Sequence, residues 1–210
     1  MDLYKALKER NLPVSNELNH RLAVLHSYIL AKKYIVSKLH MKAARNLLRV
    51  ANNINMFEKD IVNILTTVVI ECAEVELNRS ASQYALVLMN EKYKNSIKDT
   101  YRSKIDKISI KAYKHEDELM QTSSPCPFCS ENVPDYNLSC ENCKNILPFC
   151  IGSGRHILIN EMVTCPHCLF PCIQKEMLEL LKNDRLCPMC DCEIDSSMLN
   201  KVISFCVFIK

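Results

Sequence analysis

The sequence predicts a mainly α-helical chain that ends in a small cysteine-rich module, and three observations carry this prediction. Apolar residues in the first 120 positions recur at steps of three and four, which is the period of an amphipathic helix. The chain has only two glycines, Gly152 and Gly154, whereas β-rich and doubly wound folds need glycine for turns and phosphate loops. Four Cys-x-x-Cys pairs all lie after residue 125. We therefore expect a helical domain over residues 1–120 and a separate module over residues 121–210.

Five apolar stripes predict five helices in the first domain, beginning near residues 15, 41, 61, 80 and 97. Ser15 is a candidate N-cap, and Ser80 to Gln83 has the form of a capping box. The inward positions are Leu18, Leu22, Leu25 and Ile29; Met41, Ala44, Leu48 and Ala51; Ile61, Leu65, Val68, Cys72 and Val75; Ala81, either Tyr84 or Ala85, and Leu88; and Ile97, Tyr101, Ile105, Ile108 and Ala112. A shift of 37 residues aligns small residues of the second stripe with those of the fourth, which favours a tetratricopeptide-like helical solenoid over an irregular bundle.

The cysteine pairs predict structural zinc. They are Cys126/Cys129, Cys140/Cys143, Cys165/Cys168 and Cys187/Cys190. Two thiolates on one tight turn can bind a single tetrahedral Zn²⁺ at about 2.3 Å, so two turns complete a Cys₄ site and four turns complete two. A disulfide framework would need an oxidising compartment, and residues 1–12 show no signal peptide. A redox pair would need a βαβ context, and iron–sulfur clusters use closer cysteine runs.

The spacing does not decide which pairs share a metal. Ten residues separate Cys129 from Cys140, which favours local, sequential pairing because a short loop costs the least closure entropy. The alternative is the interleaved cross-brace of RING domains, so the module is described as zinc ribbon or RING-like. Four further residues are open as ligands: Cys150, His156, Cys172 and Cys192.

Charge and motifs limit the possible functions. A catalytic zinc site would need an open position and a glutamate base of the H-x-E or HExxH type, and the sequence has neither motif, so we expect no enzyme. Residues 1–125 carry 20 Lys and Arg against 14 Asp and Glu, a net +6, while residues 126–210 carry 7 against 10, a net −3. The acidic module argues against nucleic-acid binding.

The basic segment Lys92–Lys114 is either a solvated face or a contact for an acidic partner or anionic surface. No apolar run reaches the length of about 20 residues that crosses a bilayer.

The order of these motifs resembles one family over residues 126–200. Cys126-Pro-Phe-Cys129 and Cys140-x-x-Cys143-Lys144 are followed by Pro148-x-Cys150, Gly154-Arg-His156, Cys165-Pro-His-Cys168-x-Phe-Pro171 and Cys187-Pro-Met-Cys190. This is similar to the C-terminal end of the intraflagellar transport protein 144 family, the WD-repeat subunits of intraflagellar transport complex A, whose members begin with β-propellers and a long tetratricopeptide-like solenoid.

The resemblance implies a non-catalytic scaffold that contacts other subunits of complex A. It also implies roles in retrograde ciliary transport and ciliary entry of membrane proteins, and a location in the cytoplasm, the cilium and the ciliary basal body. A RING-type ubiquitin ligase module is the alternative function.

Overall fold

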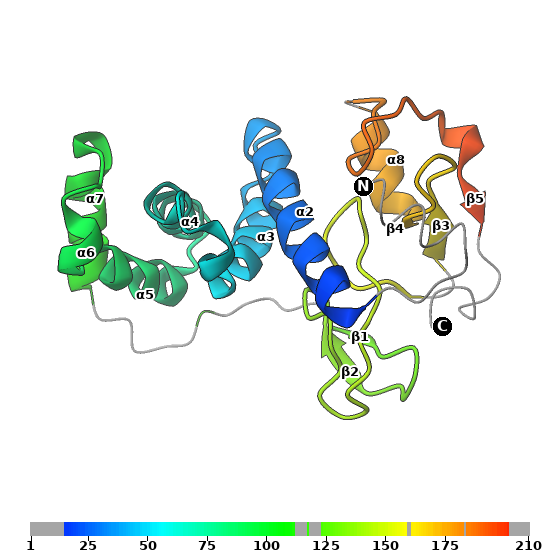
Figure 1. Ribbon diagram of the computed structural model, residues 1–210, viewed down its shortest axis with the longest axis horizontal. Helices are drawn as coiled ribbons and strands as arrows, with labels where there is room; N and C mark the ends of the chain where they lie inside the picture. The colour runs from blue at the N-terminus through cyan, green and yellow to red at the C-terminus, as the bar shows by residue number, and fades with distance from the viewer. Residues whose placement is uncertain (1–14, 112–116, 118–122, 159–160, 183, 202–210) are drawn as a thin grey trace. The chain divides into compact units, whose positions relative to one another are not determined.

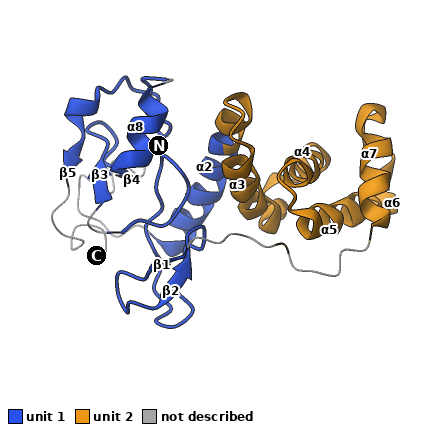
Figure 2. Cartoon of the chain, turned by 180° about the vertical axis from the view of Figure 1, so that it is seen from behind, with its two compact units in different colours: residues 1–30, 122–210 blue, residues 31–121 orange. Residues whose placement is uncertain are grey.

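The computed structural model describes residues 15–111, 117, 123–158, 161–182 and 184–201. The chain forms two compact units, residues 1–30 with 122–210 and residues 31–121 (Figure 2). The first described helix, α2 (Asn16–Val36), contributes residues to both units. The division near residue 120 stays a prediction, because the unit that holds the cysteine module also contains the first part of this helix.

The unit of residues 31–121 is helical (Figure 1). Its helices are α3 (His40–Asn52), α4 (Ile61–Glu74), α5 (Asn78–Leu88), the one-turn α6 (Glu91–Lys94) and α7 (Asp99–Ile110), with a 3₁₀ turn η1 (Ile54–Phe57) after α3. Helix α4 packs against both α3 and α5, and α5 packs against α7. The predicted helical character of this region is confirmed. None of the helices in the described ranges is long and apolar enough to cross a membrane.

The apolar stripes are right for some helices and wrong for α2, and the predicted inward residues Met41 of α3 and Tyr101 of α7 are exposed. On α4, Leu65, Val68 and Cys72 are buried as predicted, and so are Ala81 and Leu88 of α5 together with both alternatives for its third inward position. On α2, however, Leu25 and Ile29 are 46% and 47% exposed, while the buried side lies elsewhere around the helix. Helix α2 carries apolar residues around most of its circumference, so periodicity does not select one face.

Of the two predicted helix caps, one is confirmed and the other is wrong. The backbone N–H of Leu18 donates to Ser15 Oγ at 3.2 Å, which makes Ser15 the N-cap of α2. Helix α5 begins at Asn78, so the predicted capping box at Ser80 is wrong. The carboxylate of Asp117 instead accepts hydrogen bonds from the backbone N–H groups of Arg79 (2.6 Å) and Ser80 (2.7 Å). A negative charge at this position also interacts favourably with the helix dipole.

The cysteine module consists of two lobes, which we call the first lobe (residues 123–147) and the second lobe (residues 148–201). The first lobe holds the antiparallel pair β1 (Ser123–Pro125) and β2 (Asn132–Pro134). In the second lobe, β3 (Met162–Thr164) lies between β4 (Pro171–Ile173) and β5 (Asn200–Lys201). Helix α8 (Gln174–Leu181) directly follows β4, and the 3₁₀ turn η3 (Ser196–Met198) precedes β5.

The two lobes differ greatly in their apolar cores. Apart from cysteines, the buried core of the first lobe consists of Val133 and Leu147. The buried core of the second lobe is larger, and Ala23 of α2 belongs to it. Its other non-cysteine members are Phe149, Ile151, Ile157, Met162, Val163, Phe170, Ile173, Met177 and Ile194. The second lobe can therefore draw much more of its stability from apolar burial than the first.

Candidate metal centres

The structure gathers the eight predicted cysteines into two groups of four. The first tetrad is Cys126, Cys129, Cys140 and Cys143, and the second tetrad is Cys165, Cys168, Cys187 and Cys190. All sulfur atoms within each tetrad lie within 4.8 Å of one another. The grouping is sequential, with neighbouring pairs together, and it differs from the interleaved cross-brace.

The spacing of the sulfur atoms fits a tetrahedral metal site. In the first tetrad the Sγ atoms of Cys126 and Cys143 are 3.7 Å apart, and those of Cys129 and Cys140 are 3.6 Å apart. In the second tetrad, Cys165 to Cys190 is 4.0 Å and Cys168 to Cys187 is 3.9 Å. A tetrahedron with metal–sulfur bonds of about 2.3 Å has edges of about 3.8 Å. These distances are also far longer than a disulfide bond, and every cysteine in the described residues is a free thiol.

The four paired-cysteine turns share one backbone design. In the first of them, Cys126 N donates to Glu131 O at 2.7 Å and Ser130 N donates to Cys126 O at 2.9 Å. The same two bonds recur in the turns that begin at Cys140, Cys165 and Cys187. The residue after each second cysteine has a positive φ: 62° at Ser130, 58° at Lys144, 59° at Leu169 and 55° at Asp191. Left-handed backbone is uncommon for residues with a side chain, so four occurrences at one turn position mark a shared turn geometry.

Hydrogen bonds to sulfur favour the thiolate form that binds metal. The backbone N–H groups of Phe128 and Met189 donate to the first cysteine of their own turns, at 3.5 and 3.4 Å. The backbone N–H of Asn145 is the main cause that lowers the pKa of Cys143 to about 6, and the side-chain amide of Asn145 also donates to this sulfur at 3.4 Å. A thiol with this pKa ionises readily near neutral pH.

The donor sets fit zinc in a structural role. Four soft sulfur ligands in tetrahedral array are the usual surroundings of structural Zn²⁺, and they leave no open position for water or substrate. The two tetrads therefore fit two zinc ions, which confirms the predicted cofactor. When bound, each ion would join two neighbouring paired-cysteine turns.

The four residues left open as ligands lie outside both tetrads. Cys150 is wholly buried, and its sulfur accepts the backbone N–H of Ile173 at 3.1 Å. Cys172 is also buried, and its thiol donates to the carbonyl of Val163 at 3.5 Å. Burial raises the pKa of both thiols, which keeps them neutral.

The last two open candidates also have local roles. His156 donates through Nδ1 to the carbonyl of Asn137 at 3.2 Å, and burial lowers its pKa. The carbonyl of Cys192 accepts the backbone N–H of Cys187, so this residue closes a paired-cysteine turn through its backbone.

A buried ion-pair network that the sequence did not reveal connects the two lobes. Asp135, only 2% exposed, accepts hydrogen bonds from Ser124 Oγ and from the guanidinium of Arg155. The same guanidinium donates to Glu176 on α8 at 3.4 Å. Arg155 of the second lobe thereby satisfies a buried carboxylate of the first, and its planar group suits two carboxylate partners. No local sequence pattern indicates a contact between residues 20 positions apart in loops.

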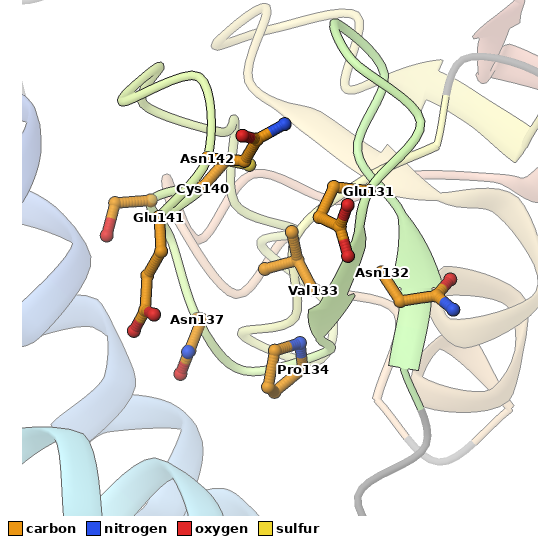
Figure 3. Close-up of a pocket in the computed structure, with 9 residues that line it drawn as sticks. Glu131, Asn132, Val133, Pro134, Asn137, Cys140, Glu141 and Asn142 are labelled. Carbon is orange, nitrogen blue, oxygen red and sulfur yellow. The ribbon is translucent and has the colours of Figure 1, made fainter.

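A pocket of about 440 Å³ lies beside the first tetrad (Figure 3). Its lining residues are Glu131, Asn132, Val133, Pro134, Asn137, Ser139, Cys140, Glu141 and Asn142. Cys140 is the one tetrad member among them, and the two glutamates give the pocket a negative charge.

Comparisons with known proteins relate this chain to WD-repeat proteins. It is 40% identical over 200 residues to WD repeat-containing protein 19 of Mus musculus and 39% identical to its Homo sapiens counterpart, covering 95% of this chain in both cases. It is 36% identical over 188 residues, 90% of the chain, to WD repeat-containing protein dyf-2 of Caenorhabditis elegans. The chain spans only 15% of the length of the mouse and human proteins and 14% of the worm protein. Residues 148–195 match the family model "IFT121, second zinc finger domain".

Proposed function

We propose that this chain is a non-catalytic scaffold section of an intraflagellar transport complex A subunit of the 144 family. The observation that carries the proposal is 40% identity to WD repeat-containing protein 19 across 95% of the chain. The match of residues 148–195 to a zinc finger family of another intraflagellar transport protein supports the same assignment. As part of this subunit, the chain takes part in retrograde ciliary transport and in the entry of membrane proteins into the cilium. Its locations are then the cytoplasm, the cilium and the basal body.

We also propose that all eight tetrad cysteines ligate zinc and that the metal has a structural role. The closed Cys₄ donor sets support this assignment, because a catalytic zinc keeps one position open. The helices of residues 1–120, as a tetratricopeptide-like solenoid, and the zinc module of residues 121–210 would each offer surface to sibling subunits. The RING-type ligase alternative requires interleaved pairing, which the sequential tetrads do not have.

The test uses the full-length protein in ciliated cells that lack the endogenous copy. The double variant Cys126→Ser/Cys165→Ser removes one sulfur from each tetrad, and Cys192→Ser is the matched control outside both tetrads. We expect the double variant to lose co-purification with other complex A subunits and to fail to restore ciliary entry of a membrane protein. Normal assembly and transport with the double variant would overturn the scaffold role of the module. Ubiquitin discharge from a charged conjugating enzyme by the purified chain would instead favour the ligase.

One surface of the helical unit suits an acidic neighbour. Lys104 and Lys107 are exposed on adjacent turns of α7, and the exposed Lys111 is the C-cap that follows the last turn of this helix. Ile105 of the same helix is fully buried, and no ion pair within the described ranges involves these three lysines. Lys114, the end of the predicted basic segment, lies outside the described residues. We infer that this lysine stripe contacts an acidic surface of another subunit.

Charge reversal tests the lysine stripe. The triple variant Lys104→Glu, Lys107→Glu, Lys111→Glu should weaken co-purification with complex A, and the loss should be greatest at low salt, where exposed charges are least screened. Reversal of the exposed lysines Lys175, Lys182 and Lys201 is the matched control. Unchanged assembly with the stripe variant would reject the contact. Loss of binding to anionic vesicles without loss of assembly would assign the stripe to a membrane instead.

A further inference from the structure

A fifth turn in the second lobe has the backbone of a paired-cysteine turn but lacks the second cysteine. Cys150 N donates to Arg155 O at 2.7 Å, and Gly154 N donates to Cys150 O at 2.8 Å, the same two bonds that define the other four turns. Gly154, at the fifth position of the turn, has a φ of 77°, where the other four turns also have a positive φ. The position of the second cysteine is occupied by Ser153.

The strands that flank the five turns also pair in one register. In each hairpin the residue before the first cysteine pairs with the residue seven positions later. These pairs are Pro125 with Asn132, Ser139 with Ile146, Phe149 with His156, Thr164 with Pro171, and Leu186 with Glu193. Identical turns closing hairpins of identical register are one structural element, used five times.

In the fifth element, backbone groups take the place of a metal. The sulfur of Cys150 accepts the N–H of Gly152 at 3.3 Å, as the first cysteine does in other turns, and also the N–H of Ile173 at 3.1 Å. Ser153 is wholly buried in the position of the absent ligand. The turn lies against α8, because a Cβ added to Gly152 would meet the backbone N of Met177 at 3.4 Å. Among the described residues Cys150 belongs to neither group of side chains that could hold a metal ion, and two N–H groups already hold its sulfur in place.

The same turn also contacts helix α2. The carbonyl of Ile151 accepts a hydrogen bond from His26 Nε2 at 2.8 Å, and both residues are buried. The ring of His26 also lies 5.8 Å from that of Phe149, centroid to centroid. Ala23 and Leu22 on α2 pack into the second-lobe core beside them. Hydrogen bonds fix the peptides on both sides of Ile151. The N–H of Ile151 donates to Pro171 O at 3.1 Å, and the N–H of Gly152, in the same peptide as the Ile151 carbonyl, donates to Cys150 Sγ at 3.3 Å.

We infer that residues 148–157 form a fifth knuckle that binds no metal and serves as the docking site for α2 within the same chain. Cys150 holds the knuckle to β4 through the N–H of Ile173. Ile151 then presents its carbonyl to His26. The attachment of the helix to the module thus depends on a cysteine that is no zinc ligand.

The experiment compares the whole zinc-loaded chain with three variants, using native mass spectrometry for metal content and hydrogen exchange for docking. Cys150→Ala should keep two zinc ions, and amide exchange over residues 16–30 should become about tenfold faster, the effect of losing one buried hydrogen bond. His26→Phe keeps an aromatic ring but removes the donor, so it should accelerate exchange of the same residues without touching the knuckle. Cys192→Ala, outside both tetrads, is the matched control and should change neither quantity.

Two results would overturn the inference. Loss of one zinc ion in Cys150→Ala would make Cys150 a ligand. Unchanged exchange over residues 16–30 in His26→Phe would show that the knuckle does not hold the helix, and this variant decides the question even if Cys150→Ala fails to fold.

Discussion

Replacing Cys143 by serine should unfold the first lobe and leave the second lobe intact. The first lobe buries two non-cysteine apolar side chains, Val133 and Leu147, which contribute about 3–6 kcal/mol together. A structural zinc site contributes apparent values of about 10–16 kcal/mol in small zinc peptides, so metal is the main source of stability in this lobe. The second lobe buries nine non-cysteine apolar side chains of valine size or larger, worth about 14–27 kcal/mol by the same measure.

The experiment measures zinc content and the protection of backbone amides from hydrogen exchange in the same sample. Native mass spectrometry should find one zinc ion in Cys143→Ser and two in the unchanged chain. Hydrogen exchange should show loss of protection over residues 123–147, while residues 161–182 keep theirs. Cys192→Ser is again the control, because this cysteine lies outside both tetrads.

Either of two results would refute this reasoning. If Cys143→Ser loses a zinc ion and residues 123–147 stay protected, apolar burial and hydrogen bonds stabilise the first lobe without metal. If both lobes lose protection together, the network around Arg155 couples them more strongly than their separate cores indicate.

Three further changes test the buried polar groups. Arg155→Met leaves the carboxylate of Asp135 buried without its cation, so urea unfolding should show a loss of about 3–5 kcal/mol, and Arg155→Lys should lose less. Burial lowers the pKa of His156, so on acidification the unfolded chain takes up a proton before the folded chain does. The free energy of unfolding should therefore fall as pH drops below about 6.5. In unfolding measurements between pH 7.5 and 5.5, His156→Gln should show a smaller fall. Asp117→Ala removes the acceptor for the first backbone amides of α5, so thermal unfolding should show a loss of about 1 kcal/mol in the stability of the helical unit. Glu74→Ala, at the exposed end of α4, is the control and should leave this stability unchanged.

The sequence predicted helices best where one apolar face is clearly defined. On α4 and α5 the buried side chains follow a single stripe, as at Leu65 and Ala81, so period and burial agree. Helix α2 is apolar on several sides, and only its packing against the second lobe decides that Ala23 is buried and Leu25 is not. The cap of α5 was unpredictable for a related reason, since Asp117 lies 37 residues beyond Ser80 and only the tertiary fold brings them together.

The eight tetrad cysteines were predictable because the two-residue spacing is a local consequence of one turn. Their grouping depends on how the turns fold together, which loop length favours but does not determine. The fifth knuckle escaped prediction because Ser153 removes the pair from the pattern. A signal was present in the sequence, however: Cys150-Ile-Gly-Ser-Gly154 matches the paired turns in length, in its first cysteine and in a residue suited to positive φ.

The five equivalent hairpins show when a knuckle can dispense with metal. In the first lobe Cys129 and Cys143 are partly exposed and few apolar groups surround them, so the hairpins there have little except a metal to hold them together. Cys150 and Ile151 are wholly buried in the second-lobe core, and hydrogen bonds from β4 fix the turn from outside. The second cysteine is therefore replaceable in the fifth hairpin, where burial and the N–H of Ile173 hold the turn, whereas each of the other four hairpins contributes both of its cysteines to a tetrad. A serine in this position is compatible with the fold only in the fifth hairpin, so Cys129→Ser should release the first zinc although Ser153 is native to the same turn.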